Sequence, residues 1–121
     1  MSDRIRHVKH HGKPIMDVDF TNCSAEEMLT VLDELQRQIA KHAPNTVLAI
    51  ADYSGAEVNK AVATRIKEVL VLDKPFVKRA AWIGAESVPK VYYENFKTFS
   101  RRDIPTFTSR EEALDWLVSS E

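Results

Sequence analysis

The sequence predicts a single α/β domain, residues 1–121, with a mixed, mostly parallel sheet of about five strands covered by four helices. Three observations lead to this fold class. Two extended segments, residues 5–10 and 14–20, flank a short glycine-containing turn and form a hairpin. Helical and strand patterns then alternate along the rest of the chain. The continuous apolar run at residues 47–51 is typical of a central parallel strand buried on both faces.

Serine and glutamate residues three positions apart indicate where three of the four helices begin. In this capping-box pattern both side chains accept hydrogen bonds from backbone N–H groups at the helix start. The pairs are Ser24 with Glu27, Ser54 with Glu57, and Ser109 with Glu112. The first helix extends to about residue 42 and the second to about residues 73–75. A further helix leads from Ser87, and strands are expected at residues 79–84 and 104–108.

Composition and charge are those of an ordinary soluble protein. The hydrophobic share is 44%, the charged share is 29% and the formal net charge is -1, so nothing attracts the whole chain to nucleic acid or anionic lipid. No segment approaches the ~20 apolar residues that span a bilayer, and the first residues lack the apolar run of a signal peptide. The single cysteine, Cys23, excludes an internal disulfide, and we expect a cytoplasmic protein.

The most informative stretch is the strand-to-helix corner Asp52-Tyr53-Ser54-Gly55. It lies beyond the carboxyl end of a parallel strand, where the functional sites of such sheets gather, and it places one hydroxyl next to the predicted second helix. A helix N-terminus stabilises an anion or a phosphorylated hydroxyl, which makes Ser54 the best functional candidate. The alternative is structural, because Ser54 with Glu57 would also serve simply as the cap of that helix.

This corner and the order of the elements resemble the STAS family, the fold of anti-sigma-factor antagonists and of sulfate-transporter tails. In the antagonists a D-x-[ST]-G corner presents a serine or threonine to a partner kinase, and the matching residue here is Ser54, flanked by Asp52 and Gly55. The ending, residues 107–117, is similar to uncharacterised bacterial proteins related to stage II sporulation protein AA. The resemblance implies a non-enzymatic regulatory module with a protein partner, a kinase or an anti-sigma-like regulator.

Two residues depart from the antagonist corner. Tyr53 stands where a small residue is usual, and Glu57 follows Ala56 where the family continues with small apolar residues. A phosphate on Ser54 would add a charge of about −1.5 to −2, which Asp52 and Glu57 would repel. Tyr53 and Glu57 are therefore counted with Asp52 and Gly55 as residues that shape any switch at Ser54.

Two other functions stay open. A small-molecule or lipid carrier would use a pocket near the third helix, where Tyr93, Lys97, Arg101 and Arg102 offer an aromatic ring and three cations to a ligand or a partner. The same cations also complement the negative C-terminal end of that helix, which is a purely structural role. A mainly structural subunit would instead form a homodimer through the hairpin or the surface of the third helix, and the exposed edge of the hairpin is what suggests it.

No metal site, cofactor or catalytic group is predicted. His7, His10 and His11 invite a metal interpretation, but neighbouring residues of an extended strand point to opposite faces. His7 and His11 would also be roughly 13 Å apart at ~3.3 Å per residue. The three glycines form no phosphate-binding loop, and Ser54 lies in no G-x-S-x-G elbow. We therefore expect no enzymatic activity.

Overall fold

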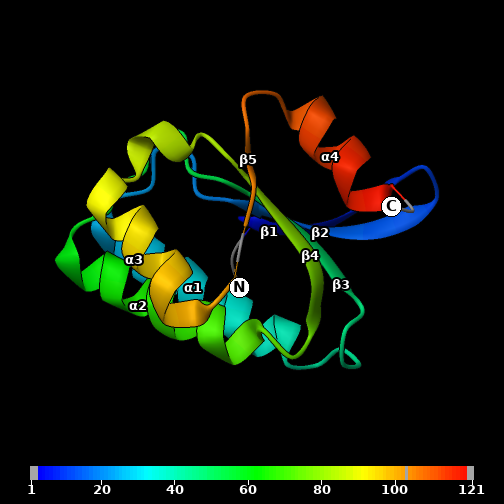
Figure 1. The fold of residues 1–121 in the computed structure, drawn as a ribbon, viewed down its shortest axis with the longest axis horizontal. Coiled ribbons are helices and arrows are strands. Elements are labelled where there is room, and N and C mark those ends of the chain that lie inside the picture. The colour runs from blue at the N-terminus through cyan, green and yellow to red at the C-terminus, as the bar shows by residue number, and fades with distance from the viewer. Residues whose placement is uncertain (1–2, 103, 120–121) are drawn as a thin grey trace.

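A five-stranded mixed sheet forms the centre of the molecule and confirms the predicted fold class (Figure 1). The computed structural model describes residues 3–102 and 104–119. The spatial order of the strands follows the chain: β1 (Ile5–His10), β2 (Lys13–Asp19), β3 (Val47–Asp52), β4 (Val77–Ile83) and β5 (Thr106–Phe107). Strands β1 and β2 form the predicted antiparallel hairpin, and the other neighbours pair in parallel.

Helices cover both faces of this sheet, but unequally (Figure 1). They are α1 (Ala25–Ile39), α2 (Lys60–Asp73), α3 (Lys90–Ser100) and α4 (Arg110–Val118), with a short 3₁₀ turn η1 (Ala85–Ser87) after β4. Each parallel crossover moves the chain one strand in the same direction, and such crossovers are right-handed. Helices α1, α2 and α3 therefore lie on one face, and only α4 returns to cover the other.

The sheet separates two hydrophobic cores of different size. The larger core lies under α1, α2 and α3 and includes the fully buried Phe20, Met28 and Phe96. The smaller core lies under α4 and consists of Ile15, Ile50, Ala81, Ile83, Ala113 and Leu117. Alternate residues of β3 enter opposite cores, Ala51 the larger and Ile50 the smaller, which is why its sequence is apolar without alternation.

The second helix starts later than its sequence pattern predicts. Helix α2 begins at Lys60, and its cap is Asn59, whose side-chain oxygen accepts a hydrogen bond from the N–H of Val62 at 2.9 Å. The predicted capping box of Ser54 with Glu57 is therefore wrong. The serine caps of α1 and α4 are confirmed, with Ser24 and Glu27 forming a complete box and Ser109 accepting from the N–H of Glu112.

The third helix begins at Lys90 and not at residue 87, because η1 occupies residues 85–87. Every helix in residues 3–102 and 104–119 is too short or too polar to cross a bilayer.

Candidate functional site

The corner that follows β3 lies in the middle of the carboxyl edge of the sheet. The N–H of Phe20, at the end of β2, donates to the carbonyl of Asp52 at 2.9 Å. On the other side, the N–H of Tyr53 donates to the carbonyl of Ile83 at 2.9 Å. The last residues of three neighbouring strands therefore meet at this corner, as the sequence predicts for a site in a parallel sheet.

The backbone around Ser54 is held from three directions. Its N–H donates to Asp52 Oδ1 at 2.9 Å, and its carbonyl accepts from the N–H of Asn22 at 2.9 Å. The next N–H, that of Gly55, donates to Ser87 Oγ at 2.8 Å. In the described part of the chain no hydrogen bond uses Ser54 Oγ. A rigid backbone therefore carries a hydroxyl that the rest of the structure does not bind.

Two glycines allow the loops at this corner to pack closely. Gly55 (φ +72°) faces Asn22, and a Cβ added to Gly55 would overlap Asn22 Oδ1. Gly84 (φ +67°) faces the corner, and an added Cβ would overlap Ser54 Oγ and lie 2.8 Å from Asp52 Oδ1. A side chain at Gly84 would meet the Ser54 backbone and separate the two loops, whereas at Gly55 the overlap is with the end of the Asn22 side chain and the left-handed backbone is the stronger reason for glycine.

Tyr53 anchors the corner from beneath. Its side chain is only 3% exposed, and its ring stacks on Phe20 at 4.9 Å and packs against Trp82 at 4.6 Å between ring centroids. Burial raises the pKa of its phenol, so the ring stays neutral at physiological pH. Tyr53 therefore replaces the usual small residue by extending into the larger core, and it adds nothing to the exposed surface of the corner.

Glu57 holds the start of α1 and has no role in α2. Its Oε1 accepts a hydrogen bond from the N–H of Ala25 at 3.0 Å, and its own N–H donates to the carbonyl of Cys23 at 2.9 Å. Because α2 starts only at Lys60, its dipole does not reach Ser54, and the predicted stabilisation of an anion there by that helix is wrong. Burial raises the pKa of the Cys23 thiol, which leaves it unreactive.

The predicted surface on the third helix divides into exposed and internal residues. The Tyr93 hydroxyl donates to the carbonyl of Ile104 at 2.9 Å, and Arg102 Nη1 donates to the carbonyl of Leu70 at 2.8 Å. These two side chains fasten α3 and the loop after it to the rest of the fold. Lys97 and Arg101 are exposed, so the four residues do not form one ligand surface.

An internal cavity does lie on the helical side of the sheet, but it is small. Its volume is about 50 Å³, and its mostly apolar lining includes Trp82 with the polar side chains of Asp73 and Arg102. Burial, opposed by Arg102 and Arg65, raises the pKa of Asp73 to about 7. A cavity of this size holds a few water molecules, and a lipid would require it to open.

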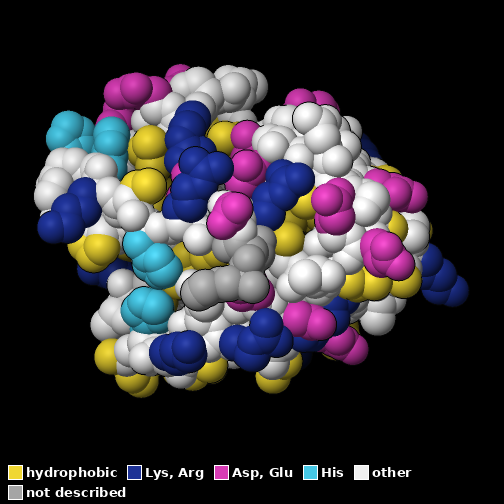
Figure 2. Space-filling view, turned by 180° about the vertical axis from the view of Figure 1, so that it is seen from behind, with side chains coloured by type: hydrophobic (Ala, Val, Ile, Leu, Met, Phe, Trp, Pro, Cys, Tyr) yellow, Lys and Arg dark blue, Asp and Glu magenta, His cyan; other side chains and the backbone are white. Residues whose placement is uncertain are grey.

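The histidines lie in two pairs, which Figure 2 shows as two groups of histidine side chains on one face of the molecule. His7 stacks on His42 with ring centroids 6.5 Å apart, and His10 meets His11 edge-on at 4.3 Å. His11 adopts a left-handed backbone (φ +51°) in the hairpin turn. The prediction that His10 and His11 point apart is therefore wrong, because His11 is no longer on the strand.

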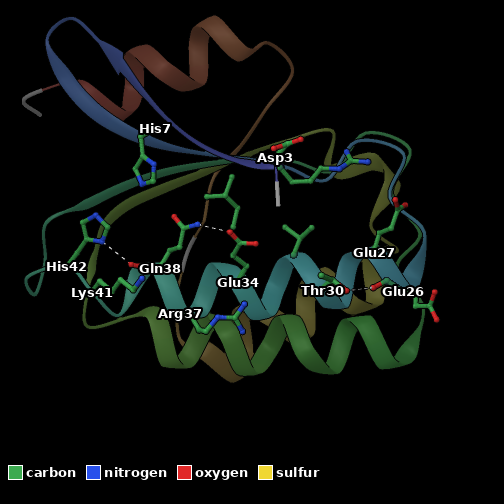
Figure 3. Close-up of a pocket in the computed structure, with 13 residues that line it drawn as sticks. Asp3, His7, Glu26, Glu27, Thr30, Glu34, Arg37, Gln38, Lys41 and His42 are labelled. Atoms are coloured by element: carbon green, nitrogen blue, oxygen red, sulfur yellow. Dashed lines mark hydrogen bonds between the residues drawn. The ribbon is translucent and has the colours of Figure 1, made fainter. Parts of the chain in front are cut away.

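An open groove of about 1220 Å³ runs between β1 and α1 (Figure 3). Charges of both signs line it along its length: Arg4 lies near Glu27 with Asp3 and Glu26, and Glu34 lies near Arg37 and Lys41 at the end that holds the His7–His42 pair. The sequence does not indicate this groove, and it does not indicate that Asn22 bonds to Ser54. Each of these features brings together segments that are far apart in the chain, and no local pattern connects them. The contact of Gly84 with Ser54 and the bond from Gly55 to Ser87 are likewise not indicated by any local pattern.

Comparison with known proteins adds two solved structures. No family model and no curated protein matches the sequence. The chain is similar to an uncharacterised DUF3478-family protein with a SpoIIAA-like fold from Shewanella loihica, at 16% identity, a TM-score of 0.70, and 93% and 91% of the two chains covered. It is also similar to an anti-sigma-factor antagonist (STAS) domain protein from Planctomyces limnophilus, at 15% identity, a TM-score of 0.62, and 95% and 98% covered. These likenesses confirm the predicted STAS-like fold.

Proposed function

We propose that this protein with a STAS-like fold is a non-enzymatic regulatory module, that it binds a protein partner through the corner of residues 52–55, and that Ser54 is its switch. The observation that supports this most directly is the contrast within one residue. The Ser54 backbone is held by Asn22 and Asp52 and, through Gly55, by Ser87, while among residues 3–102 and 104–119 no hydrogen bond uses its hydroxyl. A kinase or a partner can therefore approach that hydroxyl without competing with the fold.

The topology supports recognition at a surface. In parallel sheets, ligand crevices form where the strand order reverses, but here the order β1 to β5 has no reversal. The carboxyl edge consequently presents packed loops in place of a cleft. One of the similar structures, that from Planctomyces limnophilus, is described as an anti-sigma-factor antagonist domain, and a regulator that binds protein is the function we carry over from it as part of this proposal.

Phosphorylation of Ser54 would act on its neighbours. Ser54 Oγ lies against Gly84, and Asp52 Oδ1 is bonded to the Ser54 N–H, so a phosphate has to point outward, away from this carboxylate. We expect the added negative charge to displace the loop of residues 84–87. Backbone NMR shifts at Asn22, Gly84 and Ser87 report that displacement directly.

The test combines modification and contact mapping. Phosphopeptide mass spectrometry of the protein from its native cells examines Ser54, and cross-linking of the captured partner locates the contact on the chain. Ser54→Ala should abolish phosphate incorporation, and Ser54→Asp should change partner capture. Asn95→Asp is the matched control, because it places one negative charge at an exposed position of α3. Partner capture that is unchanged in both Ser54 variants would remove Ser54 from the mechanism.

A homodimer is a second candidate, and one observation favours it. In the described part of the chain strand β1 is paired on one side only, and the open groove lies beside it. Edge strands of this kind accept another strand. Light scattering at high protein concentration decides the matter, since a mass of one chain throughout would exclude the dimer. The carrier function keeps no comparable support, because the internal cavity holds only about 50 Å³.

A further inference from the structure

We propose that His10, His11 and Asp115 form a binding site for a divalent transition-metal ion of the zinc type. His10 ends β1, His11 lies in the hairpin turn, and Asp115 comes from α4. One ligand atom of each side chain lies within 4.8 Å of the others. His10 Nε2 is 2.7 Å and His11 Nε2 is 3.6 Å from Asp115 Oδ1. Three metal-binding groups thus converge from two segments far apart in the sequence.

The chemistry of the three groups suits zinc. Zinc binds imidazole nitrogen and carboxylate oxygen at ~2.0–2.2 Å, which places the ligand atoms of a tetrahedral site about 3.4 Å apart. The two distances to Asp115 Oδ1, 2.7 Å from His10 and 3.6 Å from His11, lie on either side of this value.

The site leaves a coordination position open. The side chains of His11 and Asp115 are 70% and 54% exposed, so a water molecule or a group of another molecule can reach the ion. Two histidines, one carboxylate and an exchangeable fourth ligand form the donor set of open zinc sites. Softer imidazole donors also select against Mg²⁺ and Ca²⁺, which prefer sites built of oxygen alone.

The proposed site is separate from the corner at Ser54. The hairpin turn precedes β2, whereas the corner follows the end of β3, and these two strands are parallel. The metal site therefore lies at the end of the sheet where β2 and β3 begin, and the Ser54 corner lies at the end where these strands finish. A result at one of them does not bear on the other.

Metal binding would join the tip of the hairpin to α4. Other contacts hold α4 in place without the ion, since Arg110 pairs with Asp17 and Lys13 Nζ donates to the carbonyl of Val118 at 3.2 Å. Variants of the three proposed ligands should therefore stay folded. An ion bound across this junction should raise the melting temperature, because it binds the folded chain and not the unfolded one.

The experiment uses the full chain without an affinity tag, since a histidine tag would itself bind metal. Zn²⁺ is titrated by calorimetry and Co²⁺ by its visible absorption, and thermal unfolding is followed with and without Zn²⁺. We expect one ion per chain and a higher melting temperature. Asp115→Asn and His11→Gln should each weaken binding at least about tenfold, by comparison with the 10–100-fold losses measured for groups one shell further from a metal.

The other histidine pair provides the matched control. His7→Gln and His42→Gln remove imidazoles that lie in the groove, and neither should change binding. Circular dichroism of each variant without metal verifies that it is folded. No Zn²⁺ binding at millimolar concentration, or equal affinity in wild type, Asp115→Asn and His11→Gln, would overturn the proposal.

Discussion

Gly84 and Gly12 adopt the same left-handed backbone in very different surroundings. At Gly12 (φ +80°) an added Cβ meets nothing within 4 Å, whereas at Gly84 (φ +67°) it would overlap Ser54 Oγ. We expect Gly12→Ala to lower the free energy of unfolding by about 1–2 kcal/mol, which is the cost of placing a residue with a Cβ in the left-handed backbone region. Gly84→Ala should cost about 1–3 kcal/mol more, because the two loops must separate.

Urea denaturation of the two glycine variants measures this difference. Adding Ser54→Gly to Gly84→Ala should restore part of the loss, since it removes the Oγ that the new Cβ meets, although the Ser54 N–H stays 2.5 Å away. Equal losses at Gly12 and Gly84 would contradict the close packing described at the corner.

Asp73 makes stability depend on pH in the direction opposite to that of most aspartates. Its side chain is 4% exposed, and burial raises its pKa to about 7, against an ordinary value of about 3.9. The folded protein therefore binds this proton more tightly than the unfolded chain does. The stabilising contribution is complete below about pH 4 and is lost as the pH rises to about 7.

Asp73→Asn should remove this dependence, because an amide has no proton to lose in that range. We expect the free energy of unfolding of the variant, minus that of wild type, to rise between about pH 4 and 7 by up to about 4 kcal/mol. Urea denaturation at several pH values measures the difference, and a constant difference would contradict the raised pKa.

At the scale of elements, the start of α2 shows how tertiary packing overrides a local pattern. Ser54 and Glu57 have the spacing of a capping box, but the chain from residue 55 to the cap at Asn59 is not helical and is bonded to the loop before α1. Ala56 and Val58 are buried, at 8% and 9% exposed, in the extended segment that precedes α2. The bonds of Glu57 to Ala25 and Cys23, which belong to another part of the chain, hold this segment out of the helix.

Two alanine substitutions distinguish the predicted cap from the observed one. Asn59→Ala should lower the free energy of unfolding by about 1 kcal/mol, because the N–H of Val62 loses its acceptor. Ser54→Ala should change it by less than about 0.5 kcal/mol, since Ser54 Oγ caps nothing. Ser24→Ala is the positive control, with its complete capping box. If Ser54→Ala lowered the free energy of unfolding as much as Asn59→Ala, Ser54 would act as a cap and the assignment to Asn59 would be contradicted.

The elements and the position of the corner could be predicted from the sequence, because both depend on local patterns. Alternation, helical spacing and the serine caps of α1 and α4 are all read within a few residues. The partners of Ser54 could not be predicted in the same way, since Asn22 and Gly84 belong to loops after other strands. The contact between Asp115 and His10 is even harder to predict from sequence, because 105 positions separate the two residues.

For the whole molecule, the unequal covering of the sheet predicts unequal local stability. Helix α4 buries only Ala113 and Leu117 against a small core, whereas α1 and α2 pack on the larger one. Hydrogen exchange should therefore open α4 at a lower free energy than α1 or α2. Leu117→Ala should accelerate exchange in α4 far more than elsewhere, because it leaves a cavity in the smaller core.

Peptide-level hydrogen exchange with mass spectrometry compares these regions. Ile66→Ala is the matched control, since Ile66 of α2 is buried in the larger core and its loss should raise exchange across the whole chain. Uniform exchange in the Leu117→Ala variant would mean that α4 unfolds only together with the rest.

The strand order has a consequence for how copies of the chain can associate. The sheet has two edges of unequal length, six residues of β1 and two residues of β5. Joining β1 of one copy to β5 of the next would repeat without end and build a filament, but β5 is too short to offer a useful ladder and Pro105 precedes it. Joining β1 to β1 produces a symmetric pair that leaves no long edge free. Association through the sheet is therefore limited to two copies, and the fold is protected against open-ended polymerisation.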